Sequence, residues 1–211
     1  MALVKSTLEN NLKKVFSDMK KAGDKTKDTD FSDGITKACK DFIEAGDITT
    51  VDAGTVSSGV FAGSGSGSIS LTDSLMKTPI VTAVNSMKTM TTGGDSILAT
   101  AIFSGLNAMV SAGKVETDVT GITTPPPPAT GTVPPSSGSA KGAMVCTYPT
   151  FVTELNQVFQ DMIDKAGDGF NGDDYLAGKL ATLVNSYVSS GVVTTAGTGA
   201  LSGTVGSGGI A

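Results

Sequence analysis

The chain contains no histidine and no tryptophan, and all 15 of its basic residues are lysines, so arginine is absent as well. Without histidine it lacks the side chain that titrates near neutral pH and that most often serves as a general base or metal ligand. Without arginine it lacks the planar group that grips phosphate or carboxylate through two parallel hydrogen bonds. These absences count against histidine-dependent catalysis and arginine-finger chemistry, and we expect a protein that is not an enzyme.

Charge and aromatic content are also low. Charged residues make up 17% of the chain and aromatic residues 5%, and the net charge is −5. Such a chain is poorly suited to bind nucleic acid by charge and stacking. The sequence contains no run of 18 apolar residues, so we expect no membrane span. The first residues do not resemble a secretory signal. We therefore expect no nucleic-acid, membrane, small-molecule or cofactor partner, and synthesis in a reducing cytoplasm with Cys39 and Cys146 as buried or incidental thiols.

Glycine is abundant, and much of it falls in an internal repeat. Residues 42–50, 109–117 and 187–195 share one nine-residue pattern: large apolar, β-branched, any, small, Gly, any, β-branched, any, Thr. Upstream of the first and third copies, residues 12–19 match residues 155–162. A repeat of this length indicates one supersecondary unit used three times. We divide the chain into units 1–70, 71–145 and 146–211.

Each unit is expected to form a helical hairpin followed by a tail. Apolar residues such as Leu8, Leu12 and Phe16 recur at steps of three and four, which is typical of one face of a helix. Two such helices are too small to bury a core alone, so their apolar faces must meet each other or partner subunits. The expected fold class is mainly α with short β segments: three tandem helical-hairpin units, each followed by a Gly/Thr/Ser-rich extended tail.

The three tails, residues 47–70, 114–145 and 192–211, alternate β-branched residues with Gly, Ser and Thr. This composition predicts short strands joined to flexible segments, including a polyproline spacer that starts at Pro125. Either these tails are linkers throughout, or their strands become ordered against a neighbouring subunit. In the second case the contact residues for a partner are Val115, Val119, Val192 and Val193.

Two glycine-rich segments are candidate binding loops, but neither matches the motif that such a loop requires. The loop from Asp168 to Asp174 is rich in oxygen ligands, but its spacing does not fit a calcium-binding loop. Residues 63–67 read Gly-Ser-Gly-Ser-Gly without the Lys-Ser/Thr of a phosphate loop, and we interpret them as linker. No serine, threonine or cysteine has a base nearby in sequence, so we assign no catalytic, cofactor or metal residues.

Residues 31–50 and 175–211 carry a resemblance to a known family. A helix that closes as Tyr-Val-Ser-Ser-Gly-Val-Val-Thr-Thr and continues into a Gly/Thr-rich tail resembles short, poorly characterised virion structural proteins of contractile-tailed bacteriophages. That family is usually a single unit, whereas this chain has three. The resemblance implies a structural component of the tail, neck, baseplate or capsid surface, located in the virion and contacting other virion proteins or further copies of itself. An adhesin-like or receptor-contacting binding module is the alternative.

Overall fold

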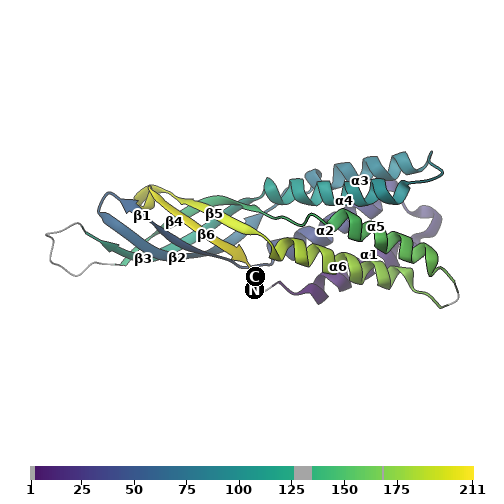
Figure 1. Cartoon of the computed structure of the whole chain (residues 1–211), viewed down its shortest axis with the longest axis horizontal. Coiled ribbons are helices and arrows are strands. Elements are labelled where there is room, and N and C mark those ends of the chain that lie inside the picture. Colours follow the sequence, from purple (N-terminus) through teal and green to yellow (C-terminus); the bar gives the residue numbers. More distant parts are fainter. Residues whose placement is uncertain (1–2, 126–134, 168) are drawn as a thin grey trace.

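The computed structural model describes residues 3–125, 135–167 and 169–211 as one elongated molecule, with a bundle of helices at one end and a β-barrel at the other (Figure 1). The same order of elements, helix, helix, strand, strand, occurs three times along the chain. The first set is α1 (Lys5–Ala22), α2 (Asp28–Glu44), β1 (Ile48–Val56) and β2 (Gly59–Ser70). The second is α3 (Ser74–Met87), α4 (Gly94–Ser111), β3 (Lys114–Thr124) and β4 (Pro135–Val145). The third is α5 (Phe151–Asp164), α6 (Gly172–Ser189), β5 (Val192–Gly197) and β6 (Thr204–Ile210).

The six strands form a closed antiparallel barrel in which each strand pairs with the next and β1 pairs with β6. The expected mainly α fold with extended tails is therefore wrong, because the tails are paired β-hairpins of one barrel. Residues 63–67, expected to be linker, lie inside β2 and pair with both β1 and β3. The expected polyproline spacer lies mostly in residues 126–134, outside the described part of the chain, and Pro135 is the first residue of β4.

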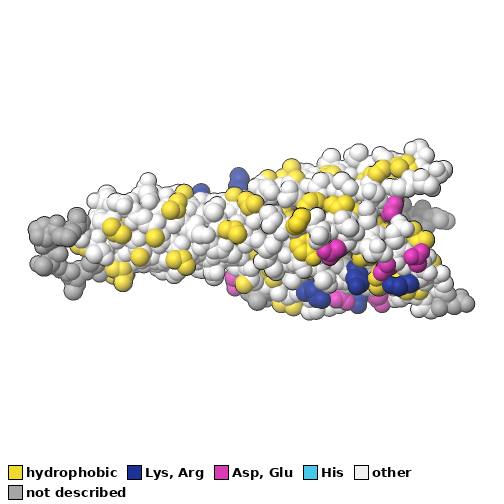
Figure 2. Space-filling model, in the orientation of Figure 1, with side chains coloured by type: hydrophobic (Ala, Val, Ile, Leu, Met, Phe, Trp, Pro, Cys, Tyr) yellow, Lys and Arg dark blue, Asp and Glu magenta, His cyan; other side chains and the backbone are white. Residues whose placement is uncertain are grey.

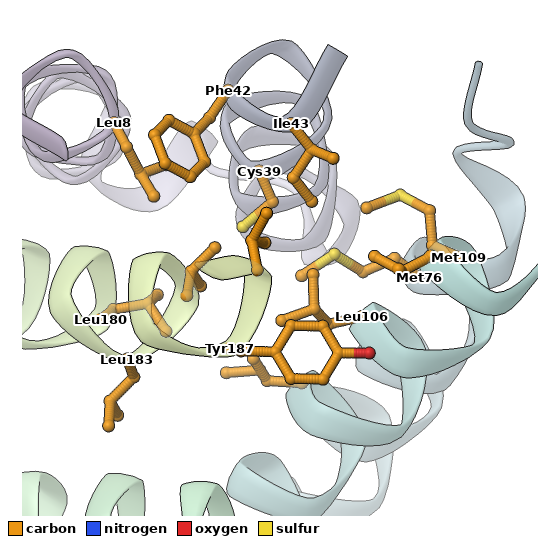
Figure 3. Close-up of a cluster of buried hydrophobic side chains, with 14 of the residues drawn as sticks. Leu8, Cys39, Phe42, Ile43, Met76, Leu106, Met109, Leu180, Leu183 and Tyr187 are labelled. Atoms are coloured by element: carbon orange, nitrogen blue, oxygen red, sulfur yellow. The ribbon is translucent and has the colours of Figure 1, made fainter. Parts of the chain in front are cut away.

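The helices also close into a ring. Each helix packs against its neighbours in the chain, and α1 packs against α6. The second helix of each hairpin buries the most side chains, and equivalent positions of the repeat are buried together in a single apolar cluster (Figure 3). One such set is Phe42, Met109 and Tyr187, all 3% exposed or less. The hydroxyl of Tyr187 donates a hydrogen bond to Asn107 Oδ1 at 2.9 Å, so its one polar group is satisfied at the edge of the cluster.

A glycine follows the second helix of each unit at the junction with the barrel, because a strand side chain from another unit packs closely against this position. A Cβ added to Gly46 would lie 2.6 Å from the side chain of Ile210, and one added to Gly113 would lie 2.7 Å from Ile69. At Gly191 the same atom would lie 3.0 Å from Met144. In each case the neighbour comes from the second strand of the unit that precedes it around the ring. The junction glycines thus let one unit's strand cover the next unit's helix end.

Inside the barrel, a glycine lies opposite a threonine at three equivalent places. Thr50 pairs with Gly208, Thr117 with Gly67 and Thr195 with Gly142. A Cβ on any of these glycines would lie 1.8–1.9 Å from a carbonyl oxygen of the paired strand. No side chain fits at such a distance, because real Cβ atoms do not approach backbone within 3 Å. The narrow barrel therefore requires glycine at these three positions.

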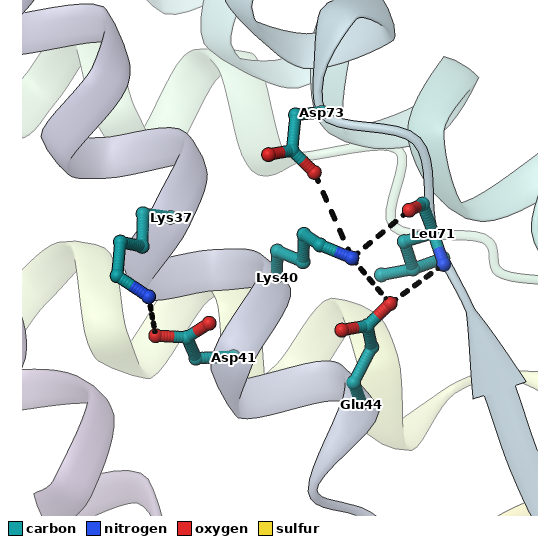
Figure 4. A network of polar contacts seen from close by, with 6 residues as sticks. All are labelled: Lys37, Lys40, Asp41, Glu44, Leu71 and Asp73. Atoms are coloured by element: carbon teal, nitrogen blue, oxygen red, sulfur yellow. Dashed lines mark hydrogen bonds and ion pairs between the residues drawn. The ribbon is translucent and has the colours of Figure 1, made fainter.

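A polar network joins the first unit to the second (Figure 4). Lys40 Nζ lies 2.5 Å from Glu44 Oε1 and 3.6 Å from Asp73 Oδ1, and it donates a hydrogen bond to the Leu71 carbonyl oxygen at 3.0 Å. Glu44 in turn accepts a hydrogen bond from the Leu71 N–H at 2.8 Å. The hydrogen bond to Glu44 raises the pKa of Lys40. This network holds the β2–α3 connection against the end of α2.

The close approach at the barrel glycines can be tested at Gly67. We expect Gly67→Ala to lower the free energy of unfolding by about 3 kcal/mol or more, because overpacking here meets backbone rather than a movable side chain. Gly167→Ala is the matched control, since its Cβ would meet nothing within 4 Å, and we expect a change within about 0.5 kcal/mol. Denaturant unfolding followed by circular dichroism measures both. Equal stability of the two variants would contradict the close approach.

Candidate assembly surface

The four valines expected to contact a partner do not share one surface. Val115, Val119 and Val193 point into the barrel and are at most 1% exposed, whereas Val192 lies outside and is 51% exposed. The cause is the two-residue period of a strand, which sends neighbouring side chains to opposite faces. The structure brings the three inward valines into the interior and leaves Val192 alone on the outer face. A partner can reach only Val192 without opening the barrel.

The outer face of the barrel is largely uncharged. Each strand exposes one β-branched aliphatic side chain there, between 51% and 74% exposed: Val51, Val60, Ile122, Val145, Val192 and Val205. Among the described strand residues, charged side chains point outward only on β3 and β4, and they are Lys114, Glu116, Asp118 and Lys141. Figure 2 shows the result, a barrel surface of polar uncharged and apolar side chains beside a charged lower face of the bundle.

Part of this surface is continuous across strands. Val205 of β6 pairs with Ala53 of β1, and Ala53 pairs with Ala62 of β2. Ala62 pairs with Ile122 of β3, which pairs with Pro135 of β4. All five side chains are exposed. Sequence reasoning missed this row, because its members are single apolar residues scattered among serines and threonines, and only the register aligns them.

The α3–α4 hairpin carries a second uncharged face. A groove between these two helices is lined only by small or apolar uncharged residues, among them Pro79, Thr82, Ile97 and Thr100. Two charged residues of this hairpin pair with neighbouring hairpins: Lys77 pairs with Asp33 of α2 at 2.5 Å, and Asp95 accepts a hydrogen bond from Gln160 of α5 at 2.5 Å. Leu75, Met90 and Ile97 are each 36–38% exposed on this hairpin.

The other two hairpins have ordinary charged surfaces. On α1, Lys13 pairs with Glu9 at 2.8 Å, one helical turn away. On α5, Asp161 accepts hydrogen bonds from Tyr175, Gln157 and Lys165, which together lower its pKa to about 2. The uncharged face is therefore a property of one unit among three.

The remaining candidate groups have structural environments. Asn171 Oδ1 accepts a hydrogen bond from the Asp174 N–H at 3.3 Å and so caps the start of α6. Asp168 lies outside the described residues, and the described ones gather no group of three or more acids or thiols that could hold a metal ion. Both cysteines are free and buried, and burial raises the pKa of Cys39 to about 12 and that of Cys146 to about 11. Such thiols are poor nucleophiles.

Comparison with known proteins gives no relative. No protein-family model, curated protein or solved structure matches the chain. Within the described residues, none of the helices combines the length and apolar character needed to cross a membrane.

Two adjacent valines test the division between the inside and the outside of the barrel. We expect Val193→Asp to cost more than about 3 kcal/mol of stability, because it buries a carboxylate without a partner. Val192→Asp places the same charge one residue away on the outer face, and we expect a change within about 0.5 kcal/mol. Thermal unfolding of both variants is the measurement. A barrel that tolerates Val193→Asp as well as Val192→Asp would contradict this assignment.

Proposed function

We propose that this chain is a non-enzymatic structural component of a bacteriophage virion, located in the tail, neck or baseplate or on the capsid surface. Other virion proteins are its partners. The resemblance of residues 31–50 and 175–211 to short virion proteins supports the assignment to a bacteriophage particle.

The observation that carries the proposal is the arrangement of three equivalent units in one closed ring. A helix ring and a strand ring both close between the third unit and the first, through α1 with α6 and β1 with β6. Phage particles place components on threefold and sixfold axes, and a protein with three near-equivalent sides fits such a position. The largely uncharged barrel exterior and the uncharged groove between α3 and α4 provide contact area that needs little desolvation of charge.

The barrel exterior also favours a second candidate, an adhesin-like or receptor-contacting module. The same hydroxyl-rich, uncharged strands would offer hydrogen bonds and apolar contact to a ligand on a cell surface. The two candidates differ in what the isolated protein does, since a module of this kind binds its target alone and a structural component requires the particle.

The proposal is tested by following a tagged chain in cells that produce the particle. We expect the full-length protein to sediment with purified particles at a fixed stoichiometry on a density gradient. Recovery of the chain only in the soluble fraction, with no particle-associated pool, would overturn the proposal. Binding of the purified chain to whole cells without particles would favour the receptor-contacting module.

A pair of isoleucines tests which face makes the contact. We expect Ile97→Asp, in the uncharged groove of the α3–α4 hairpin, to reduce incorporation at least tenfold, because a desolvated charge in a contact surface costs more than about 1.4 kcal/mol. Ile163→Asp is the matched control, since Ile163 is 64% exposed on the charged α5 side, and we expect normal incorporation. Both variants are first shown to fold by circular dichroism. Equal incorporation would assign the contact to another surface.

A further inference from the structure

Among the described strand residues, one acidic side chain lies in the interior of the barrel. Asp52 of β1 is 0% exposed, and none of the described lysines forms an ion pair with it. Thr50 Oγ1 donates a hydrogen bond to Asp52 Oδ2 at 2.6 Å, and Thr195 Oγ1 donates to Asp52 Oδ1 at 3.3 Å. An ionised carboxylate without a counter-charge is costly to bury, even with two hydroxyl donors.

The buried acid Asp52 is not a feature of the repeat, because the other two units lack it. The positions equivalent to Asp52 in the other two units, each two residues after the conserved threonine of the pattern, are Val119 and Gly197. The barrel can therefore be closed with an apolar residue or with no side chain at this place. At this position only the first unit carries a carboxylate, so the packing of the barrel alone does not explain Asp52.

A second polar group in the same layer lacks a partner. Thr117 of β3 is 2% exposed, and its Oγ1 forms no hydrogen bond within the described structure. It faces Gly65 of β2, where even a methyl side chain would crowd the neighbouring oxygens. An added Cβ at Gly65 would lie 2.5 Å from Thr50 Oγ1, 3.0 Å from Asp52 Oδ2 and 3.2 Å from Thr117 Oγ1. Three oxygens from two strands thus converge on one side-chain-free position.

The oxygens in this layer can serve a cation as well as each other. A hydroxyl that donates its proton to a carboxylate keeps two lone pairs, so Thr50 and Thr195 can donate to Asp52 and still accept a cation. All the available donors are hard oxygens, and imidazole and thiolate are absent, which favours a hard cation over a transition metal. With one carboxylate and otherwise neutral hydroxyls, a charge of +1 balances the site.

We propose that the barrel interior holds a dehydrated alkali cation, Na⁺ or K⁺, bound by the Asp52 carboxylate and the hydroxyls of Thr50, Thr117 and Thr195. The cation neutralises the buried acid and gives the Thr117 oxygen its missing partner. The site is enclosed by the apolar residues on either side, among them Val115, Val193 and Val119, so the ion is taken up as the barrel folds.

The test is thermal unfolding of the full chain, refolded and measured in NaCl, KCl or choline chloride at equal ionic strength. Because the folded state alone holds the site, the melting temperature is expected to rise by about 3–6 °C for each tenfold increase in the free cation concentration above the dissociation constant. Choline is too large to enter and sets the baseline. Equal melting temperatures in all three salts would overturn the proposal.

Three variants separate this site from general salt effects. Thr117→Val and Asp52→Asn should each abolish the difference between the alkali cations and choline. Thr36→Val is the matched control, because Thr36 is also 2% exposed with an unpaired hydroxyl, but it lies in helix α2. It should keep the full cation response. A cation response that survives in Thr117→Val would place the ion elsewhere and overturn the assignment.

Discussion

The small bore of a six-stranded barrel is the constraint on which the rest of this structure depends. Inward positions cannot all carry side chains when strands curve so tightly, and glycine opposite each ring threonine lets the backbones approach. The same requirement reaches the helices, since glycine at each helix–strand junction admits a strand side chain from the neighbouring unit. Every unit therefore depends on a neighbour to complete its packing, and the helix ring and strand ring close together.

The repeat and the helices could be predicted from the sequence because they depend on local spacing. The pattern at residues 42–50, 109–117 and 187–195 contains the large apolar residues of the helix core together with the first inward residues of the barrel. These positions keep similar chemistry in all three units because they pack against one another.

The barrel could not be predicted from the sequence for a physical reason. In a sequence, a half-buried strand is normally recognised by alternating large apolar and polar side chains. Strand β2 instead alternates glycine with serine over much of its length. In this interior a buried residue is often one with no side chain, so burial leaves no hydrophobic signal. Pairing then depends on register between segments far apart in the chain, which also decided that Val193 lies inside and Val192 outside. The candidate site at Asp52 was hidden in the same way, because only closure brings Thr117 to it.

The covalent connection of the three units has a consequence for symmetry. Three separate identical chains arranged in the same ring would have to carry every substitution three times, and three acids facing one narrow interior would repel one another. A single chain escapes that restriction, because it can carry a different residue in each unit, and the covalent connection keeps the three units together at any concentration. The acid in the barrel and the uncharged groove of the α3–α4 hairpin are both differences of this kind. The molecule thus has three units of similar architecture, and these differences make its three sides chemically distinct.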